Sequence, residues 1–571
     1  MKQQIMKPIF LFSFILFCLI VLTPVDTVFA YQISTTDVDF NDAFAISPVK
    51  FDLIMEAGAK LDKQIVVINK SRDDLIFELS IEDFVASKNS EETISFLGEE
   101  SGQNFSLKDY IKPEISSFTL APKEQISFNV NINLADDIIA GSHYAALIAS
   151  AKKKTIGEFS QVESLSRVAS LFLLNVKRAG GAVDNSAIAM DNGSLQKLEV
   201  GWDKEKSAPN IQMTFKNDNQ THLVLNGRVE INNFLGKKID QADFDSWYVL
   251  PNSARQKTIN LSEKLFWGKY SVRVEVFWKD GDTNKEYRAD KNINFWVLPS
   301  KLIIIFMSII LVLLIILSVF FLKKFKKPLS IFVILILFVM LNFYHIAYAE
   351  MNSSNYRIMN ESINFGGTEF GKSTNYNVSD SMGGVGGNGQ SASYQMFGGT
   401  RLPATLSIST ASNASMSSCA QSGGCSSSAS LSWTVTTDNL DGYSLSISAS
   451  TNPAMQTSGG TFADFSPTSG ATSFWSVGST ASAFGFSVGA SGQTDILSVF
   501  KDDGTNCSAG STLARCFRGF NGTTAVQIVN RTTPAVSGNA TTVNLQAEIG
   551  NNHTQTAGSY TATITATASA L

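Results

Sequence analysis

The stretch "KQIVVINKS" (Lys63–Ser71) indicates the fold class, because it runs from strand-type residues into an Asn-containing turn, and "SFNVNI" (Ser127–Ile132) further along alternates between polar and apolar residues. This period of two is typical of a half-buried β-strand. A second stretch, "IQMTFKNDN" (Ile211–Asn219), ends in the same kind of turn. Each is followed by a turn with Pro and then by a strand with Gly and Tyr near its start: "LAPKEQ" (Leu120–Gln125) and "AGSHYAALIA" (Ala140–Ala149), then "VLPNSARQ" (Val249–Gln256) and "WGKYSVRVEV" (Trp267–Val276). The repeat predicts two stacked immunoglobulin-like β-sandwiches.

The repeat also sets the expected domain boundaries. We expect a first sandwich over residues 31–179 and a second over residues 180–300, with the boundary near Gly180 and Gly181. A chain of 571 residues is too long for one hydrophobic core. Further domains are therefore expected after residue 300.

The same stretches, together with the preceding "AISPVKFDLIMEAGAKLD", resemble the WxL-interacting protein family of bacterial cell surfaces. The resemblance covers about residues 44–327 and includes the order of signal peptide, two β-domains, membrane helix and basic tail. It implies two immunoglobulin-like domains, the first associated with peptidoglycan binding and the second with binding to a partner or host matrix. A pilus-chaperone-like sandwich shares many of these motifs. No ligand-contacting residue can be assigned by matching motifs.

Both ends of the first half carry export and membrane signals. Residues 1–30 contain early lysines, the apolar run Ile9–Leu22 and small residues at Val28 and Ala30, which predicts a signal peptide cut after Ala30. Leu302–Leu322 has no charged side chain and is long enough for a transmembrane helix.

A second apolar segment follows the basic residues 323–327, which we expect in the cytoplasm. Together with these lysines, residues 328–349 have the parts of a signal peptide, and they end in Ala347-Tyr348-Ala349. Two alternatives stay open, an internal signal peptide cut after Ala349 and an uncleaved second transmembrane helix. In either case both large halves are expected outside the cell membrane, and the C-terminal half could be released. A fusion of two adjacent genes is a further explanation.

The C-terminal half has a different composition. Residues 350–403 are predicted to form a Gly/Ser-rich stalk in which the copies "SSNYRI", "STNYNV" and "SASYQM" mark short strands. Residues 404–571, rich in Ser, Thr, Ala and Gly, are predicted to form a sandwich-like β-domain. "LSWTV" and "AGSYTATITATA" look distantly like a WxL surface domain, although Val435 stands where that family has Leu, and a fimbrial or spore-coat-like subunit is a comparable match.

Four of the five cysteines lie in this last third of the chain. Outside the membrane they would be oxidised, so the simplest expectation is two short-loop disulfides, Cys419 to Cys425 and Cys507 to Cys516. A zinc site is the less favoured alternative, because the spacings do not suit one and no His lies nearby.

The sequence gives little support for catalysis. "GFSVG" (Gly485–Gly489) formally matches a nucleophile elbow, with Asp495 and His553 after it in hydrolase order, but no helical run follows it. A net charge of −5 argues against a nucleic-acid partner. We therefore predict no enzyme, no cofactor and no small-molecule substrate.

No metal site is predicted either. His143, His222 and His345 are isolated from one another in sequence. The acidic groups Asp37, Asp39 and Asp42, and the turn at residues 502–504, are interpreted as solvated loops rather than calcium sites. The lysines 152–154 are expected at a solvated hairpin tip, although they could attract an anionic wall polymer. Four tryptophans are expected mainly in sandwich cores, with Trp296 as a candidate for the membrane interface: Trp247, Trp267, Trp278 and Trp296.

The sequence as a whole predicts a mainly β, membrane-anchored bacterial surface protein that binds cell-wall polymer or other surface proteins. The alternative is a chaperone-like assembly factor for a fimbrial or surface-layer subunit, which could be its own C-terminal half.

Overall fold

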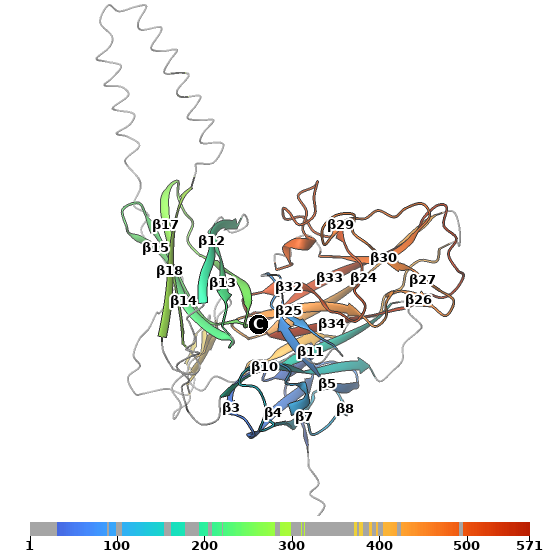
Figure 1. Ribbon diagram of the computed structural model, residues 1–571, viewed down its shortest axis with the longest axis horizontal. Coiled ribbons are helices and arrows are strands. Elements are labelled where there is room, and N and C mark those ends of the chain that lie inside the picture. The colour runs from blue at the N-terminus through green and yellow to red at the C-terminus, as the bar shows by residue number, and fades with distance from the viewer. Residues whose placement is uncertain are drawn as a thin grey trace, which may run out of the picture.

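The computed structural model is built almost entirely from β-strands (Figure 1). It describes residues 31–87, 89, 91–98, 105–153, 162–177, 193–203, 208–219, 221–279, 286–297, 310, 313, 371–373, 376–380, 387–390, 395–397, 403–410, 412–419, 424–489 and 495–570. The prediction of a mainly β chain with sandwich-like sheets is confirmed.

The first module, residues 31–177, is a β-sandwich in blue and teal in Figure 1. Its strands are β1 (Gln32–Thr35), β2 (Ala43–Ser47), β3 (Lys50–Glu56), β4 (Lys60–Asn69), β5 (Leu75–Ala86), β6 (Ile94–Phe96), β7 (Ile111–Pro113), β8 (Ser117–Leu120), β9 (Glu124–Asn133), β10 (Gly141–Lys153) and β11 (Val162–Lys177), with a short 3-10 helix η1 (Lys108–Tyr110).

The second module, residues 193–297, is a separate sandwich with its own core. One sheet has the order β12-β13-β16 and the other β15-β14-β17-β18. The strands are β12 (Gly193–Asp203), β13 (Ala208–Asn217), β14 (Leu223–Asn233), β15 (Lys238–Val249), β16 (Ser253–Asn260), β17 (Gly268–Lys279) and β18 (Glu286–Val297).

The C-terminal module, residues 403–570, is the third sandwich and lies at the right of Figure 1 in orange and red. Its strands are β23 (Leu406–Ser409), β24 (Cys425–Thr437), β25 (Tyr443–Ala449), β26 (Gln456–Thr457), β27 (Gly460–Thr461), β28 (Ala463–Asp464), β29 (Ser473–Phe474), β30 (Ser482–Val488), β31 (Cys516–Phe517), β32 (Val526–Arg531), β33 (Ala535–Ile549) and β34 (Ala562–Ala570), with the 3-10 helix η3 (Ser498–Phe500).

A small antiparallel sheet precedes this module, within the region expected to be a stalk. Its strands are β19 (Gly371–Ser373), β20 (Tyr376–Asp380), β21 (Gly387–Gln390) and β22 (Gln395–Phe397), in that order. Strands β20 and β22 fall on the second and third Tyr-containing copies, where short strands were expected.

The repeat seen in the sequence corresponds to a repeated structural element. Asn69 and Asn217 are both fully buried at the ends of β4 and β13. The Asn69 amide donates to the carbonyl oxygens of Asp73 and Leu120, at 2.8 and 3.0 Å. The Asn217 amide donates to those of Thr221 and Val249, both at 2.9 Å. In both modules a buried amide thus ties the end of one strand to the segment that carries the Pro turn, and satisfies backbone groups that water cannot reach.

The two disulfides of the C-terminal module have the predicted pairing, Cys419 to Cys425 and Cys507 to Cys516. The first bond closes a loop with a sequence separation of 6 residues and the second a loop with a separation of 9. Both cross-link loops of a module that is rich in small side chains.

Replacing Cys507 and Cys516 together by Ser is expected to lower the stability of the C-terminal module by about 2–3 kcal/mol, because the unfolded chain regains the entropy that this loop removes. Calorimetry should show a lower Tm for the module. The pair Cys419 and Cys425, which closes the shorter loop, should give a slightly smaller drop when replaced in the same way. Equal Tm values for the parent and the Cys507/Cys516 variant would contradict the prediction.

The expected membrane segments and cleavage sites lie outside the described residues. This applies to Ala30, to Ala349, to residues 328–349 and to all of 302–322 except residues 310 and 313. Among the described residues, no helix is long and apolar enough to cross a bilayer. Both membrane segments therefore stay predictions.

Candidate functional site: the junction between the modules

The first and C-terminal modules share both of their β-sheets. Strand β11 pairs antiparallel with β10 along one edge, from Ser166 to Val176. Along its other edge, the second half of β11 pairs in parallel with β3, and its first half pairs in parallel with β34, from Val162 with Ala562 to Ala169 with Ser569. The strand is thus long enough to belong to two modules at once, and Figure 1 shows β11 and β34 side by side.

The second sheet is joined in the same way. Strand β2 lies between β4 of its own module and β23 of the C-terminal module, and pairs antiparallel with both. Strands β34 and β23 would each present an open edge without the first module, and an open edge is prone to pair with other chains. The first module therefore closes one edge of each C-terminal sheet.

The side chains at the junction form one continuous hydrophobic core. The same cluster of buried residues includes Phe44 and Phe128 of the first module and Trp433 and Ile564 of the C-terminal module. Val162 is fully buried, exchanges two backbone hydrogen bonds with Ala414, and lies beyond the part of β11 that pairs with β10. Its burial thus depends on the C-terminal module, and full burial of such a side chain contributes about 1.5–3 kcal/mol.

Small polar side chains of β11 add hydrogen bonds across the junction. The Ser166 hydroxyl donates to the Ser409 carbonyl at 2.8 Å, and the Ser164 hydroxyl donates to the Ser412 carbonyl at 3.2 Å. Elsewhere along the junction, the backbone N–H of Thr93 donates to the side-chain oxygen of Gln527 at 3.0 Å. Each of these donors thus has an acceptor across the junction, so the contact between the modules does not leave it unsatisfied.

A buried carboxylate, Asp441, connects all three modules. Its side chain is 6% exposed and lies 3.5 Å from the Lys50 ammonium of the first module and 3.4 Å from the Lys257 ammonium of the second. Burial lowers the pKa of Lys50 to about 8, although the charge of Asp441 opposes this effect. Burial also lowers the pKa of nearby Arg255 to about 10, again against the influence of Asp441. The site therefore gathers cations from two modules around a carboxylate from the third.

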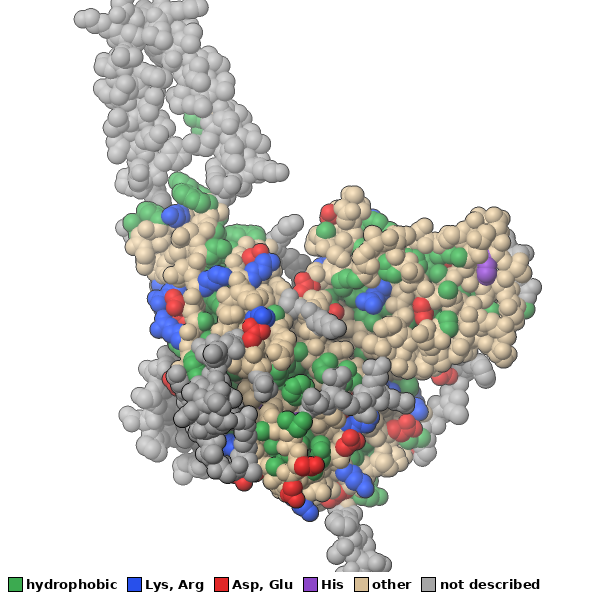
Figure 2. Space-filling model, viewed as in Figure 1, with side chains coloured by type: hydrophobic (Ala, Val, Ile, Leu, Met, Phe, Trp, Pro, Cys, Tyr) green, Lys and Arg blue, Asp and Glu red, His purple; other side chains and the backbone are tan. Residues whose placement is uncertain are grey.

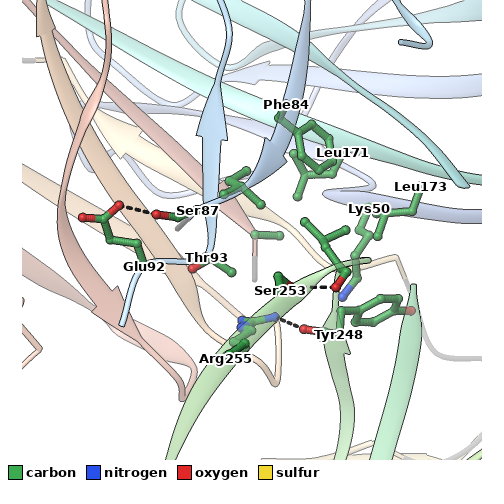
Figure 3. Close-up of a pocket in the computed structure, with 14 residues that line it drawn as sticks. Lys50, Phe84, Ser87, Glu92, Thr93, Leu171, Leu173, Tyr248, Ser253 and Arg255 are labelled. Carbon is green, nitrogen blue, oxygen red and sulfur yellow. Dashed lines mark hydrogen bonds between the residues drawn. The ribbon is translucent and has the colours of Figure 1, made fainter. Parts of the chain in front are cut away.

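A small cavity adjoins this cluster (Figure 3). It is bordered by residues of all three modules, including Leu171 and Leu173 of β11, Tyr248 and Arg255 of the second module, and Ala570 at the end of β34. The Arg255 guanidinium donates to the Tyr248 carbonyl at 2.5 Å, and the Lys50 ammonium lies 3.7 Å from the centre of the Tyr248 ring. Strand β3 begins at Lys50 and follows β34 along the same edge of β11. The end of β34 therefore lies beside the cations Lys50 and Arg255.

A second polar cluster fixes the first module against the second. Asp52 accepts from the Tyr248 hydroxyl at 3.2 Å and lies 3.2 Å from the His222 ring nitrogen Nε2, while Ser142 lies 3.0 Å from Nδ1. Burial opposes ionisation of Asp52, but its bonds to His222 and Tyr248 outweigh this effect and lower its pKa.

This contact should weaken in acid. Because the pKa of Asp52 is below 3.8 in the folded protein, its ionised form contributes stability above pH 3.8 that is lost as the pH falls through the folded pKa. In the parent, the urea midpoint of the second module should therefore fall as the solution becomes acidic. In Asp52→Asn this fall should be smaller. An identical pH profile for the variant and the parent would contradict this assignment.

The structure does not assemble the formal hydrolase signature. Ser487 is fully buried in β30 and donates to the Ala514 carbonyl at 3.1 Å. Asp495 pairs with Arg531 at 2.5 Å, and His553 contacts Thr480 and Gln555. The absence of enzyme activity stays a prediction.

The other candidate sites also have structural partners. His143 is buried between the carbonyls of Ser106 and Ile139. Lys152 and Lys153 pair with Glu78 and Asp73 at the end of β10. Within the part of the chain that the structure describes, no group of three or more His, Cys, Asp or Glu side chains is placed to hold a metal ion. His345 lies outside that part.

One tryptophan prediction is wrong. Trp247 and Trp278 are core residues as expected, but Trp267 is 71% exposed. It lies in the loop just before β17, outside both sheets, so no facing strand covers it. Trp296, 67% exposed, is on the outer face of β18, where burial alternates along the strand.

The sequence raised the association of the first half with its own C-terminal half as the alternative, but it did not locate the junction. One signal was present, because "VESLSRVASLFLLNVK" (Val162–Lys177) is mixed polar and apolar in its first half and mostly apolar in its second. Such a change within one strand indicates two different environments. No pattern in the sequence indicated that Lys50, Lys257 and Asp441 would meet.

No protein-family model matches the sequence, and no curated protein matches it either, so the resemblance to the WxL-interacting family stays a prediction. Among solved structures, a chain of the CsuC–CsuE chaperone–tip adhesion subunit pre-assembly complex from archaic chaperone-usher Csu pili of Acinetobacter baumannii is 14% identical. The match covers 43% of this chain and 97% of that chain, with a TM-score of 0.23.

Two further structures match at a comparable level. A chain of the Salmonella enterica SafA pilin in complex with the SafB chaperone is 13% identical, with 47% of this chain and 100% of that chain covered and a TM-score of 0.22. The Pseudomonas aeruginosa CupB2 chaperone is 12% identical, with 42% and 96% covered and a TM-score of 0.20. At these identities and TM-scores the likeness carries no weight for function.

Proposed function

We propose that the first two modules act as an assembly chaperone for a β-subunit, and that this subunit is the C-terminal module of the same chain. The observation that carries the proposal is the parallel pairing of β11 with β34, by which the first module lends a strand to the C-terminal sheet. Strand addition of this kind supplies backbone hydrogen bonds along the edge and side chains to the core.

Two features of the junction support a holding role. Strand β2 closes the edge of the other C-terminal sheet, so both open edges are protected from pairing with other chains. Asp441 of the subunit contacts the second module as well as the first, so both sandwiches take part in holding the subunit.

The proposal includes location outside the cell membrane and anchoring through residues 302–322. The two disulfides of the C-terminal module support this location, because such bonds persist in oxidising compartments. Cleavage after Ala349 would then leave two chains joined only by the junction. Binding to cell-wall polymer or to other surface proteins stays a prediction.

The proposal is tested by cleaving the chain between the proposed chaperone and its proposed subunit. A site for a specific protease is inserted after Gly399, between β22 and β23, and the purified full chain is cleaved in detergent solution. We expect the fragments to co-elute in gel filtration and to separate only in denaturant. Separation in buffer directly after cleavage would overturn the proposal.

A further inference from the structure

The second module carries a group of large exposed hydrophobic side chains at one end. Phe234 and Leu235 form the turn after β14, Phe266 and Trp267 come just before β17, and Trp296 is the second-last residue of β18. The strand register places them together, because Asn233 pairs with Tyr270 and Lys269 with Trp296. We name this group the aromatic tip.

The aromatic tip is not part of the module's core. The five side chains are between 67% and 81% exposed, whereas Trp247 and Trp278 of the same module are at most 3% exposed. On the facing sheet, Trp202 near the end of β12 is also 41% exposed. It pairs with Pro209, whose neighbour Asn210 pairs with the last residue of β16, so it belongs to the same end. Figure 2 shows hydrophobic side chains gathered at the upper end of this module.

Such a cluster requires an explanation. Single exposed apolar residues are ordinary, but a group of this size at one end of a module indicates a surface that binds a protein, a membrane or a ligand. Phe and Trp at loop tips are typical of segments at the boundary between headgroups and acyl chains.

The charges around the aromatic tip favour an anionic surface. Four exposed lysines lie in the same turns and strand ends: Lys237, Lys238, Lys264 and Lys269. Two acidic residues, Asp240 and Glu263, lie beside them, and Asp240 is engaged in accepting from the backbone N–H groups of Ser262 and Glu263. The remaining positive excess suits anionic lipid headgroups, which attract lysines close to the membrane surface.

The chain itself indicates which surface is near. The last residue of β18, Val297, is followed after four residues by the uncharged stretch 302–322. Four residues in extended conformation reach at most about 14 Å. If that stretch enters a bilayer, the end of β18 must therefore lie close to its surface.

We propose that the aromatic tip docks into the headgroup region of the membrane in which residues 302–322 are anchored. The tip then acts as a second, interfacial anchor that sets the orientation of the second module. The lipid partner is an anionic bilayer, recognised by aromatic insertion and lysine attraction.

Docking of the aromatic tip does not depend on the chaperone role. It is tested with the full chain in phosphatidylglycerol–phosphatidylcholine vesicles. Leu235→Cys is labelled with a solvent-sensitive fluorophore, and a nitroxide is carried on the upper acyl chain of the lipid. The described cysteines are held in disulfides and do not compete for the label. The matched control is Asp218→Cys, in the exposed turn after β13 at the opposite end of the module.

We expect the Leu235→Cys probe to emit at shorter wavelength in vesicles than in the urea-unfolded protein and to lose most of its emission to the nitroxide lipid. The Asp218→Cys probe should remain water-exposed and unquenched. Equal behaviour of the two probes, whether both are quenched or neither is, would overturn the proposal. Shorter-wavelength emission at Leu235→Cys without nitroxide quenching would also overturn it, because the tip would then be covered by protein.

A second variant tests the aromatic residues themselves. Phe266→Ser with Trp267→Ser should restore the emission of the Leu235→Cys probe in nitroxide vesicles, while Ile139→Ser, an exposed apolar residue of the first module, should not. Retained quenching in the double variant would contradict docking through the aromatic side chains.

Discussion

Replacing Val162 by Asp is expected to release the C-terminal module from the cleaved protein. Val162 is fully buried at the start of β11 and contacts the C-terminal module through Ala414 and Ala562. An unpaired carboxylate at this position costs about 3–5 kcal/mol, which is more than a hundredfold in the equilibrium between bound and free fragments. The protease-cleaved variant should elute as two separate fragments where the parent elutes as one.

The neighbouring residue provides the control for this variant. Glu163 is exposed on the same strand and pairs with Thr563, so Glu163→Lys changes a charge without entering the core. It should leave the fragments together. Because β10 contacts β11 only from Ser166 onward, Val162→Asp should also leave the first module folded. Co-elution of the Val162→Asp fragments would contradict the importance of the shared core.

Asp441→Ala is expected to give the second large effect. The substitution leaves the ammonium groups of Lys50 and Lys257 without their carboxylate in a site where each side chain is at most 13% exposed. Removal of one partner of a buried ion pair typically costs 3–5 kcal/mol. Burial, no longer opposed by Asp441, favours the uncharged form of Lys50 in the variant, so part of this cost is avoided and we expect about 3 kcal/mol.

The effect should therefore depend on pH. Below pH 8, Lys50 of the parent is charged beside Asp441, so the variant should dissociate at a clearly lower denaturant concentration than the parent; above pH 8 the difference should shrink. The control is Asp243→Asn, which breaks an exposed pair with Arg228 and should change the midpoint little. No difference at any pH would show that Asp441 does not connect the modules, and a pH-independent difference would contradict the contribution of Lys50.

Local sequence patterns predicted much of the fold and little of the site. The patterns of "KQIVVINKS" and "IQMTFKNDN" predicted two strands that end in Asn-containing turns, because residue period and turn chemistry act over a few residues, and the structure shows an equivalent buried asparagine at each end. The short disulfides were predictable for the same reason.

The junction depends on contacts between segments far apart in sequence. Val162 and Ala562, or Lys50 and Asp441, meet only where the first and C-terminal modules join, and neither pair has a local pattern that identifies its partner. The exposure of Trp267 was missed because the sequence next to a strand does not show whether a facing sheet covers a tryptophan there.

Cysteine cross-linking of residues that the register makes partners shows whether β11 lies in parallel beside β34 in the native protein. Glu163 is opposite Thr563, whereas Thr567 lies four residues further along β34, about 13 Å away. After mild oxidation and cleavage at the inserted site, the pair Glu163→Cys/Thr563→Cys should hold both fragments together on a non-reducing denaturing gel. The pair Glu163→Cys/Thr567→Cys should not. Equal cross-linking of the two pairs, or cross-linking of neither, would contradict the account.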